Sequence, residues 1–249
     1  MKRVHLLDEL RGITLLSMVF FHAVWDLVYI FGMEWEWFYT PIAYVWQQSI
    51  CWTFIFLSGF CWSLGKRKLR RGLLVSVAGL LVSFVTEIAT PEQRIRFGVL
   101  TLLGVCMLIM IPLEKLLKNV AAKVGFVGSA LLFLLTRNIN EGYLGFEALN
   151  LVKLPEGWYK LGDAATFIGF TDKYFYSADY FSVLPWIFLF VAGYFGYRIA
   201  AEGKLLAKIS DWHMPIGFFG KLGKQSLIIY MLHQPVIYLG LSFIFYIIK

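Results

Sequence analysis

The stretch LLDELRGITLLSMVFFHAVWDLVYIF, residues 6–31, decides the fold of this chain. From Gly12 to Phe31 it is almost entirely apolar, and a helix that crosses a bilayer needs about 20 such residues. The apolar run is longer than that of a cleaved signal peptide, and no A-x-A cleavage site follows it. The stretch therefore predicts a membrane-spanning helix that stays in the protein.

The rest of the chain has the same character. Its 249 residues are 59% hydrophobic and 16% charged, whereas a soluble domain has about 25% charged residues. The mean hydropathy is +0.68. This composition excludes a soluble enzyme, a disordered chain and a secreted disulfide scaffold. The 3 cysteines lie in apolar runs and offer neither a disulfide framework nor a CxxC metal site.

Six further stretches are long and apolar enough to suggest spans. We predict an all-α, polytopic membrane helical bundle with about seven transmembrane helices, which form a single integral-membrane domain over residues 1–249. The further stretches are Val45–Leu64, Gly72–Ile88, Phe97–Leu113, Val120–Thr136, Leu184–Ala200 and Ser226–Ile248.

The distribution of Lys and Arg predicts the orientation. Most of the 23 basic residues fall in inner segments if the N-terminus is cytoplasmic, and the cluster Lys66–Arg71 is the strongest signal. We therefore predict a multi-pass protein of the inner or plasma membrane, with the N-terminus inside and the C-terminus outside. The basic residues are expected to contact lipid headgroups rather than nucleic acid. An outer loop, residues 137–183, and an inner segment, Ala201–Gln225, connect the later spans.

Three polar residues of the first span fall on one helical stripe. At 100° per residue, Arg11 and His22 differ by about 20° and His22 and Asp26 by about 40°, and His22 lies about 16 Å deeper than Arg11. Ionisable residues inside a membrane mark functional sites by default. We expect His22 to act as a general base whose tautomer Asp26 fixes, and the alternative is a structural clamp between helices. Asp8 is expected to cap the helix or to pair with Arg11.

Two other motifs carry polar or small residues. In SLIIYMLHQPVIY, His233 and Gln234 precede Pro235. These two residues either line the same cavity as His22 or form hydrogen bonds that hold neighbouring helices together around a proline kink. In FIFLSGF, the small residues Ser58 and Gly59 favour close helix packing over room for a ligand chain.

At this point the chain resembles a known family. The segments LDELRGITLLSMVFFHAVWD, FIFLSGF, RFGVLTLLG and GKQSLIIYMLHQPV resemble, in this order, segments of the heparan-alpha-glucosaminide N-acetyltransferase catalytic-domain family of the transmembrane acyltransferase superfamily. The related acyltransferase-3 branch is marked by an Arg, ten residues and a His, which is the spacing of Arg11 and His22. The human-type enzyme of the family places a functional His around the first outer loop, whereas the loop Gly32–Tyr44 contains none.

The resemblance implies a membrane-embedded acyltransferase. Acyl-CoA, in particular acetyl-CoA, would be the cytoplasmic co-substrate, with Arg11 binding it and no metal. From the residues themselves we further expect Ser58 and Gln234 to lie beside the acyl-CoA. A hydroxyl or amine of a glycan or other envelope acceptor would receive the acyl group. The resemblance assigns the catalytic role to His22. From the residues themselves we further expect Asp26 to orient His22, and His233 or Gln234 to polarise the thioester carbonyl. For assembly, a homo-oligomer is one possibility. For function, one alternative is a small transporter or flippase that uses His22, Asp26 and His233, and the other is a non-catalytic membrane partner.

Overall fold

A computed structural model describes residues 4–210 and 217–248. The predicted inner residues Lys2 and Arg3 and part of the inner segment Ala201–Gln225 lie outside these ranges. The described chain is mostly helical, as predicted, and its contacts divide it into two compact units. Met1–Phe54 and Gly203–Lys249 form what we call the terminal unit, and Ile55–Glu202 forms the central unit.

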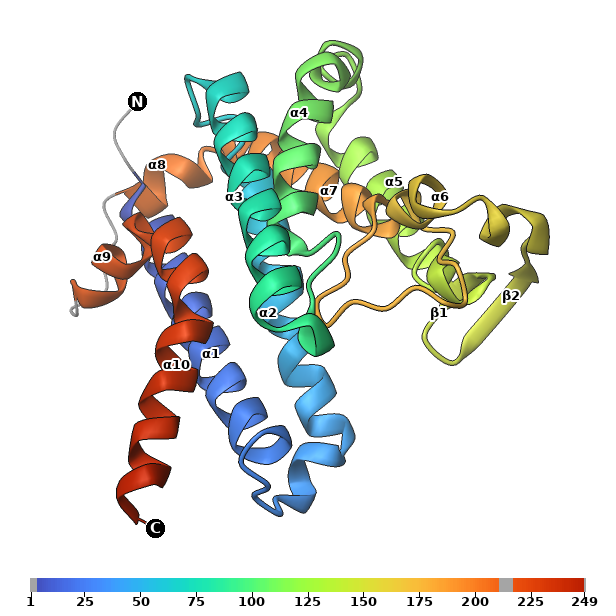
Figure 1. The fold of residues 1–249 in the computed structure, drawn as a ribbon. Coiled ribbons are helices and arrows are strands. Elements are labelled where there is room, and N and C mark those ends of the chain that lie inside the picture. The colour runs from blue at the N-terminus through green and yellow to red at the C-terminus, as the bar shows by residue number, and fades with distance from the viewer. Residues whose placement is uncertain (1–3, 211–216, 249) are drawn as a thin grey trace. The chain divides into compact units, whose positions relative to one another are not determined.

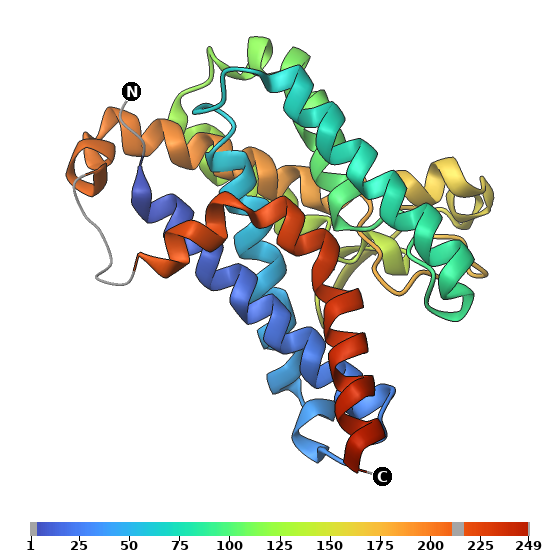
Figure 2. The same ribbon diagram turned by 60° about the vertical axis from the view of Figure 1, so that its left-hand side comes forward.

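The terminal unit contains the first and last long helices of the chain. Its elements are α1 (His5–Tyr29), η1 (Glu36–Tyr39), most of α2 (Pro41–Phe60), α8 (Leu205–Ser210), α9 (Phe218–Lys224) and α10 (Ser226–Ile248). Helices α1 and α10 lie side by side and run in the same direction (Figures 1 and 2). Leu15, Met18 and Phe21 of α1 form a buried core with Ile50 of α2.

Close backbone contacts hold α9 against the start of α1. A Cβ added at Gly12 would collide with the carbonyl of Phe219, and one added at Gly223 would collide with the carbonyl of Asp8. Only glycine permits this approach. Asp8 lies inside α1 and pairs with Arg11 over 3.6 Å, which confirms the predicted ion pair. The alternative that Asp8 caps the helix is wrong, because α1 begins at His5 and Asp8 lies within its first turn.

The central unit contains the middle helices and the predicted outer loop, residues 137–183, which we call the outer segment. Its elements are α3 (Lys68–Ala89), η2 (Pro91–Gln93), α4 (Val99–Leu117), α5 (Ala122–Leu135), η3 (Ile139–Glu141), β1 (Tyr143–Phe146), β2 (Leu149–Lys153), η4 (Glu156–Lys160), α6 (Asp163–Ile168) and α7 (Val183–Glu202). Strands β1 and β2 form an antiparallel hairpin. Helix α3 packs on α4, and α5 packs on α7.

Small residues set the helix spacing in the central unit. A Cβ at Gly59 would collide with the carbonyl of Phe190 in α7, and a Cβ at Gly193 would collide with the carbonyl of Phe56 in α2. The two helices therefore approach each other backbone to backbone. The prediction that Gly59 serves close helix packing is confirmed.

Ion pairs and hydrogen bonds join the predicted inner segments at one end of the central unit. Lys68 forms an ion pair with Glu114, and its ammonium lies 4.9 Å from the ring centre of Trp62. Arg198 donates hydrogen bonds to the carbonyls of Leu117 and Val120 at 3.0 and 2.9 Å. The start of α3, the end of α4 and the end of α7 therefore meet.

The predicted outer segments meet in the same way. Arg96 forms an ion pair with Asp163, and the backbone N–H of Val99 donates to Asp179 at 3.1 Å. The carboxylate of Asp179 thus accepts from the free N-terminus of α4, which a helix end requires. Burial of this carboxyl raises the pKa of Asp179 to about 6, although the Val99 hydrogen bond lowers it.

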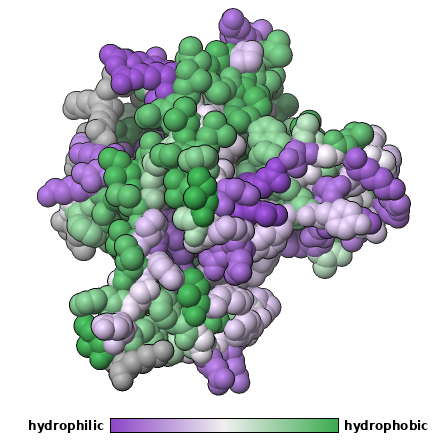
Figure 3. Space-filling model, in the orientation of Figure 1, coloured by the Kyte–Doolittle hydropathy of each residue, from purple (hydrophilic) through white to green (hydrophobic). Residues whose placement is uncertain are grey.

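Five described helices are long and apolar enough to cross a membrane. They are α1, α3, α4, α7 and α10. Helix α5 has 14 residues and is about 21 Å long, which is shorter than the hydrocarbon core of a bilayer. Five candidate spans support a membrane protein, and the count of seven stays a prediction. The face of α3 that Figure 3 shows is hydrophobic, as lipid contact requires, whereas the outer segment is mostly polar.

Candidate active site

The structure brings four of the six predicted site residues together. His22 and Asp26 of α1 face His233 and Gln234 of α10, all within the terminal unit. The contact of His22 with His233 and the contact of Asp26 with Gln234 lie one helical turn apart along α1, since His22 and Asp26 are separated by four residues. We call these four residues the polar cluster.

The two histidines are in ring contact. The centres of the His22 and His233 rings lie 4.7 Å apart, with 59° between the ring planes. Nδ1 of His233 lies 2.5 Å from the carbonyl oxygen of Tyr230. Because a carbonyl can only accept, Nδ1 carries the proton in this contact and Nε2 is left as the basic atom of a neutral ring.

Asp26 is paired with α10 rather than with His22. Its side chain is fully buried, with 0% of its surface exposed, and Oδ1 accepts a hydrogen bond from Nε2 of Gln234 at 2.6 Å. The expectation that this carboxylate fixes the tautomer of His22 therefore does not match the contact seen here. The physical reason is that the Gln234 amide offers a donor across the helix contact, and a buried carboxylate takes the nearest donor.

Three atoms of the polar cluster are buried without a hydrogen bond to any described residue. They are Oδ2 of Asp26, Oε1 of Gln234 and Nε2 of His233. His22 itself is half-buried. Buried polar atoms are usually paired, so a group of unpaired ones indicates a place where a further molecule binds.

Arg11 and Ser58 lie outside the polar cluster. Arg11 is one of the first residues of α1, about 16 Å along the helix from His22, and its partner is Asp8. Ser58 belongs to the central unit and is half-buried on α2. Sequence reasoning missed one contributor, the backbone carbonyl of Tyr230. The only signal for it was its position three residues before His233, where a helical side chain can reach back.

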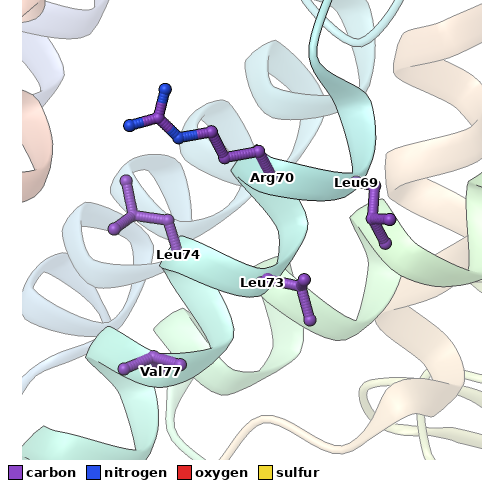
Figure 4. Close-up of a pocket in the computed structure, with 5 residues that line it drawn as sticks. All are labelled: Leu69, Arg70, Leu73, Leu74 and Val77. Carbon is purple, nitrogen blue, oxygen red and sulfur yellow. The ribbon is translucent and has the colours of Figure 1, made fainter.

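Two surface hollows are described, and none of the four residues of the polar cluster lines either of them. One of about 390 Å³ runs along α3 and is lined by Leu69, Leu73, Leu74 and Val77, with Arg70 at its N-terminal end (Figure 4). Its apolar lining suits contact with lipid rather than catalysis. The other, of about 360 Å³, lies at the far end of α1. Within the described ranges, we find no group of three or more His, Cys, Asp or Glu side chains that could hold a metal ion.

Hydrogen bonds of Asn140 join distant parts of the predicted outer loop, residues 137–183. The amide nitrogen of Asn140 lies 3.0 Å from the carbonyl oxygen of Gly169, 2.9 Å from Oγ of Ser182 and 3.2 Å from the hydroxyl of Tyr180. The Tyr180 hydroxyl in turn donates to the carbonyl of Thr166. Asn140 thus ties together the start and the end of the segment.

A family of known proteins matches most of the chain. The family described as heparan-alpha-glucosaminide N-acetyltransferase, catalytic, matches residues 3–235. No curated protein and no solved structure matches the chain. The matched region covers α1 and the part of α10 that carries His233 and Gln234, and it confirms the resemblance found in the sequence. The chain therefore belongs to the heparan-alpha-glucosaminide N-acetyltransferase catalytic-domain family, a family of transferases.

Proposed function

We propose that the protein is a membrane-embedded acetyltransferase that moves an acetyl group from cytoplasmic acetyl-CoA to an amine or hydroxyl of a glycan or other envelope acceptor. The observation that carries this proposal is the contact of His22 with His233 inside two candidate spans of a chain that belongs to a transferase family. Imidazoles are the side chains best suited to move a proton near neutral pH.

His22 is the proposed general base. It takes the proton from the acceptor nucleophile while that atom forms a bond to the carbonyl carbon of the thioester. The C–S bond then breaks, and the thiolate of coenzyme A takes the proton back from the imidazolium. His233 is in ring contact with His22, and its Nε2 is a second basic atom of the site because its Nδ1 is held by Tyr230.

The start of α1 is the proposed contact for the phosphates of the co-substrate. Arg11 pairs with Asp8 over 3.6 Å, which is long for an ion pair and open to competition from phosphate. The glycine contacts at Gly12 and Gly223 hold α9 beside this segment, and the exposed Lys221 of α9 adds positive charge there. The role of Ser58 in binding acyl-CoA stays a prediction from the sequence.

The arrangement of helices supports the proposed sidedness. Because α1 and α10 run in the same direction, their far ends leave a bilayer on the side opposite their starts (Figure 1). The basic ends of α3, α4 and α7 meet in the central unit, as inner segments should. We propose that these ends face the cytoplasm of a cell whose inner or plasma membrane holds the protein.

The test is acetyl transfer by purified protein in detergent. Radiolabelled acetyl-CoA is supplied with a panel of sugar amines and sugar alcohols, and His22→Ala is expected to abolish transfer while the protein remains folded. The matched control is His5→Ala, which removes a histidine of the same helix outside the polar cluster. Full activity of His22→Ala would remove His22 from the mechanism. Substrate uptake into vesicles without any acetyl transfer would favour the transporter.

A further inference from the structure

The hollow on α3 has an apolar lining and a positive charge at one end. It is lined by Leu69, Leu73, Leu74 and Val77, with Arg70 in the first turn of the helix, and we call it the α3 hollow (Figure 4). From Leu69 to Val77 the helix rises about 12 Å, and the hydrocarbon core of one leaflet is about 15 Å deep. The α3 hollow therefore covers most of the depth of one leaflet and ends in a charge.

The charge at this end is accessible to an anion. Within the basic cluster Lys66–Arg71, Lys68 is engaged by Glu114. The side chains of Arg67 and Arg70 are exposed, and no carboxylate within residues 4–210 and 217–248 pairs with either of them. A guanidinium binds phosphate through two parallel N–H groups, and basic residues beside a membrane span attract anionic lipids. The end of the α3 hollow is therefore suited to a phosphate group.

The same face of α3 stays apolar beyond the α3 hollow. Leu80, Leu81 and Phe84 continue it at helical spacing, and all three side chains are exposed. A second copy of the chain packed on this face, about an axis normal to the membrane, would bring the two Arg70 side chains together, and like charges disfavour that contact. A phospholipid matches both features of the face, because its acyl chains are apolar and its phosphate is negative.

We infer that α3 binds an anionic phospholipid, whose phosphate contacts Arg70 and whose acyl chain lies in the α3 hollow. The lipid belongs to the leaflet that surrounds the start of α3. Arg67, which immediately precedes the helix, adds a second positive charge for the headgroup. Binding of this lipid does not depend on the proposed acetyl transfer, since no residue of the polar cluster lines the α3 hollow.

The experiment is native mass spectrometry of the full-length protein in detergent with added lipid. Phosphatidylglycerol and phosphatidylcholine with identical acyl chains are supplied separately, and the bound fraction gives an apparent dissociation constant for each. One basic residue near a membrane surface strengthens the binding of an anionic lipid about fivefold, so the wild type is expected to prefer phosphatidylglycerol by at least that factor. Equal dissociation constants would overturn the inference, and so would a protein that forms dimers and binds neither lipid.

Two variants and one competitor locate the site. Arg70→Gln removes the charge and keeps a polar side chain, so the preference for phosphatidylglycerol should fall about fivefold. The matched control is Lys118→Gln, which removes an exposed charge immediately after α4, outside the α3 hollow, and should keep the preference. An unchanged preference in Arg70→Gln, or an equal loss in both variants, would refute the site. Glycerol phosphate has the charge without the acyl chains and should leave the bound lipid in place; its displacing the lipid would show a site for small phosphates and overturn the inference.

Discussion

The hydrogen bond between Asp26 and Gln234 makes a quantitative prediction about stability. Asp26 is fully buried, so replacing Gln234 by Leu leaves its carboxylate with neither oxygen paired to a described residue. Losing the partner of a buried polar group costs about 1–3 kcal/mol. Gln234→Leu alone should therefore lower the free energy of unfolding by about that amount. Asp26→Leu removes the carboxylate itself, and in its presence Gln234→Leu should cost much less.

The interaction free energy between Asp26 and Gln234 is obtained from a double-mutant cycle of Asp26→Leu and Gln234→Leu. Hydrogen bonds between helices in a membrane contribute about 0.6 kcal/mol on average and about 1.7 kcal/mol at most, so a coupling energy of about 1 kcal/mol is expected. The assay is reversible unfolding in mixed micelles, followed by the fluorescence of the 9 tryptophans. The control cycle pairs Asp26→Leu with Val236→Ala, whose side chain is 64% exposed, and its two effects should add.

A coupling energy indistinguishable from that of the control would refute the reasoning. It would show that the carboxylate and the amide are not paired. Since the contact between His22 and His233 depends on the same register of α10 against α1, it would remove the support for the histidine pair as well.

Two further predictions concern the central unit. Gly59→Ala should lower the apparent melting temperature in detergent, because its Cβ collides with the carbonyl of Phe190 and overpacking costs about 1–3 kcal/mol. The control is Gly128→Ala in α5, whose Cβ meets nothing within 4 Å and should leave the melting temperature unchanged. Equal melting temperatures of the two variants would contradict the close approach of α2 and α7. Burial raises the pKa of Asp179 from 3.8 to about 6, so the folded chain holds this proton more tightly and the free energy of unfolding should fall as pH rises through that interval. The free energy of unfolding should fall by less than about 3 kcal/mol, because Asp179 is only half-buried and water screens its charge. Asp179→Asn should abolish this pH dependence in melting curves between pH 4 and 7. An unchanged pH dependence in the variant would show that another group titrates.

The helices could be predicted from local composition, because each long apolar run must satisfy its own backbone in a membrane. Two of the seven predicted spans are not among the five candidate helices of the described chain, so they stay predictions. The apolar run Val120–Thr136 predicts a membrane-spanning helix, whereas α5 covers only the 14 residues Ala122–Leu135. Helix α2 has the length of a span, but it carries Gln and Trp residues among its apolar ones and is not among the five candidates.

The polar cluster was predictable only in part. Helical periodicity placed His22 and Asp26 on one inward face, and this depends only on residues four apart. The partner of Asp26 depends on a residue 208 positions away, and nothing in a single sequence indicates which donor a buried carboxylate will find. The Tyr230 carbonyl that orients His233 is indicated only by its position three residues earlier, and that spacing is weak evidence because every residue has a carbonyl.

The position of His22 along α1 favours the proposal that the two substrates arrive from opposite sides. His22 lies about 26 Å from the start of α1 at His5 and about 10 Å from its end at Tyr29. An acceptor that enters from the far end reaches the imidazole over a short path, and its sugar ring can stay near the surface. A donor held by its phosphates at Arg11 must extend about 16 Å along the helix, which only a long flexible arm can do. Coenzyme A has such an arm, so the unequal depths favour acyl transfer over a path in which one solute crosses the whole bilayer.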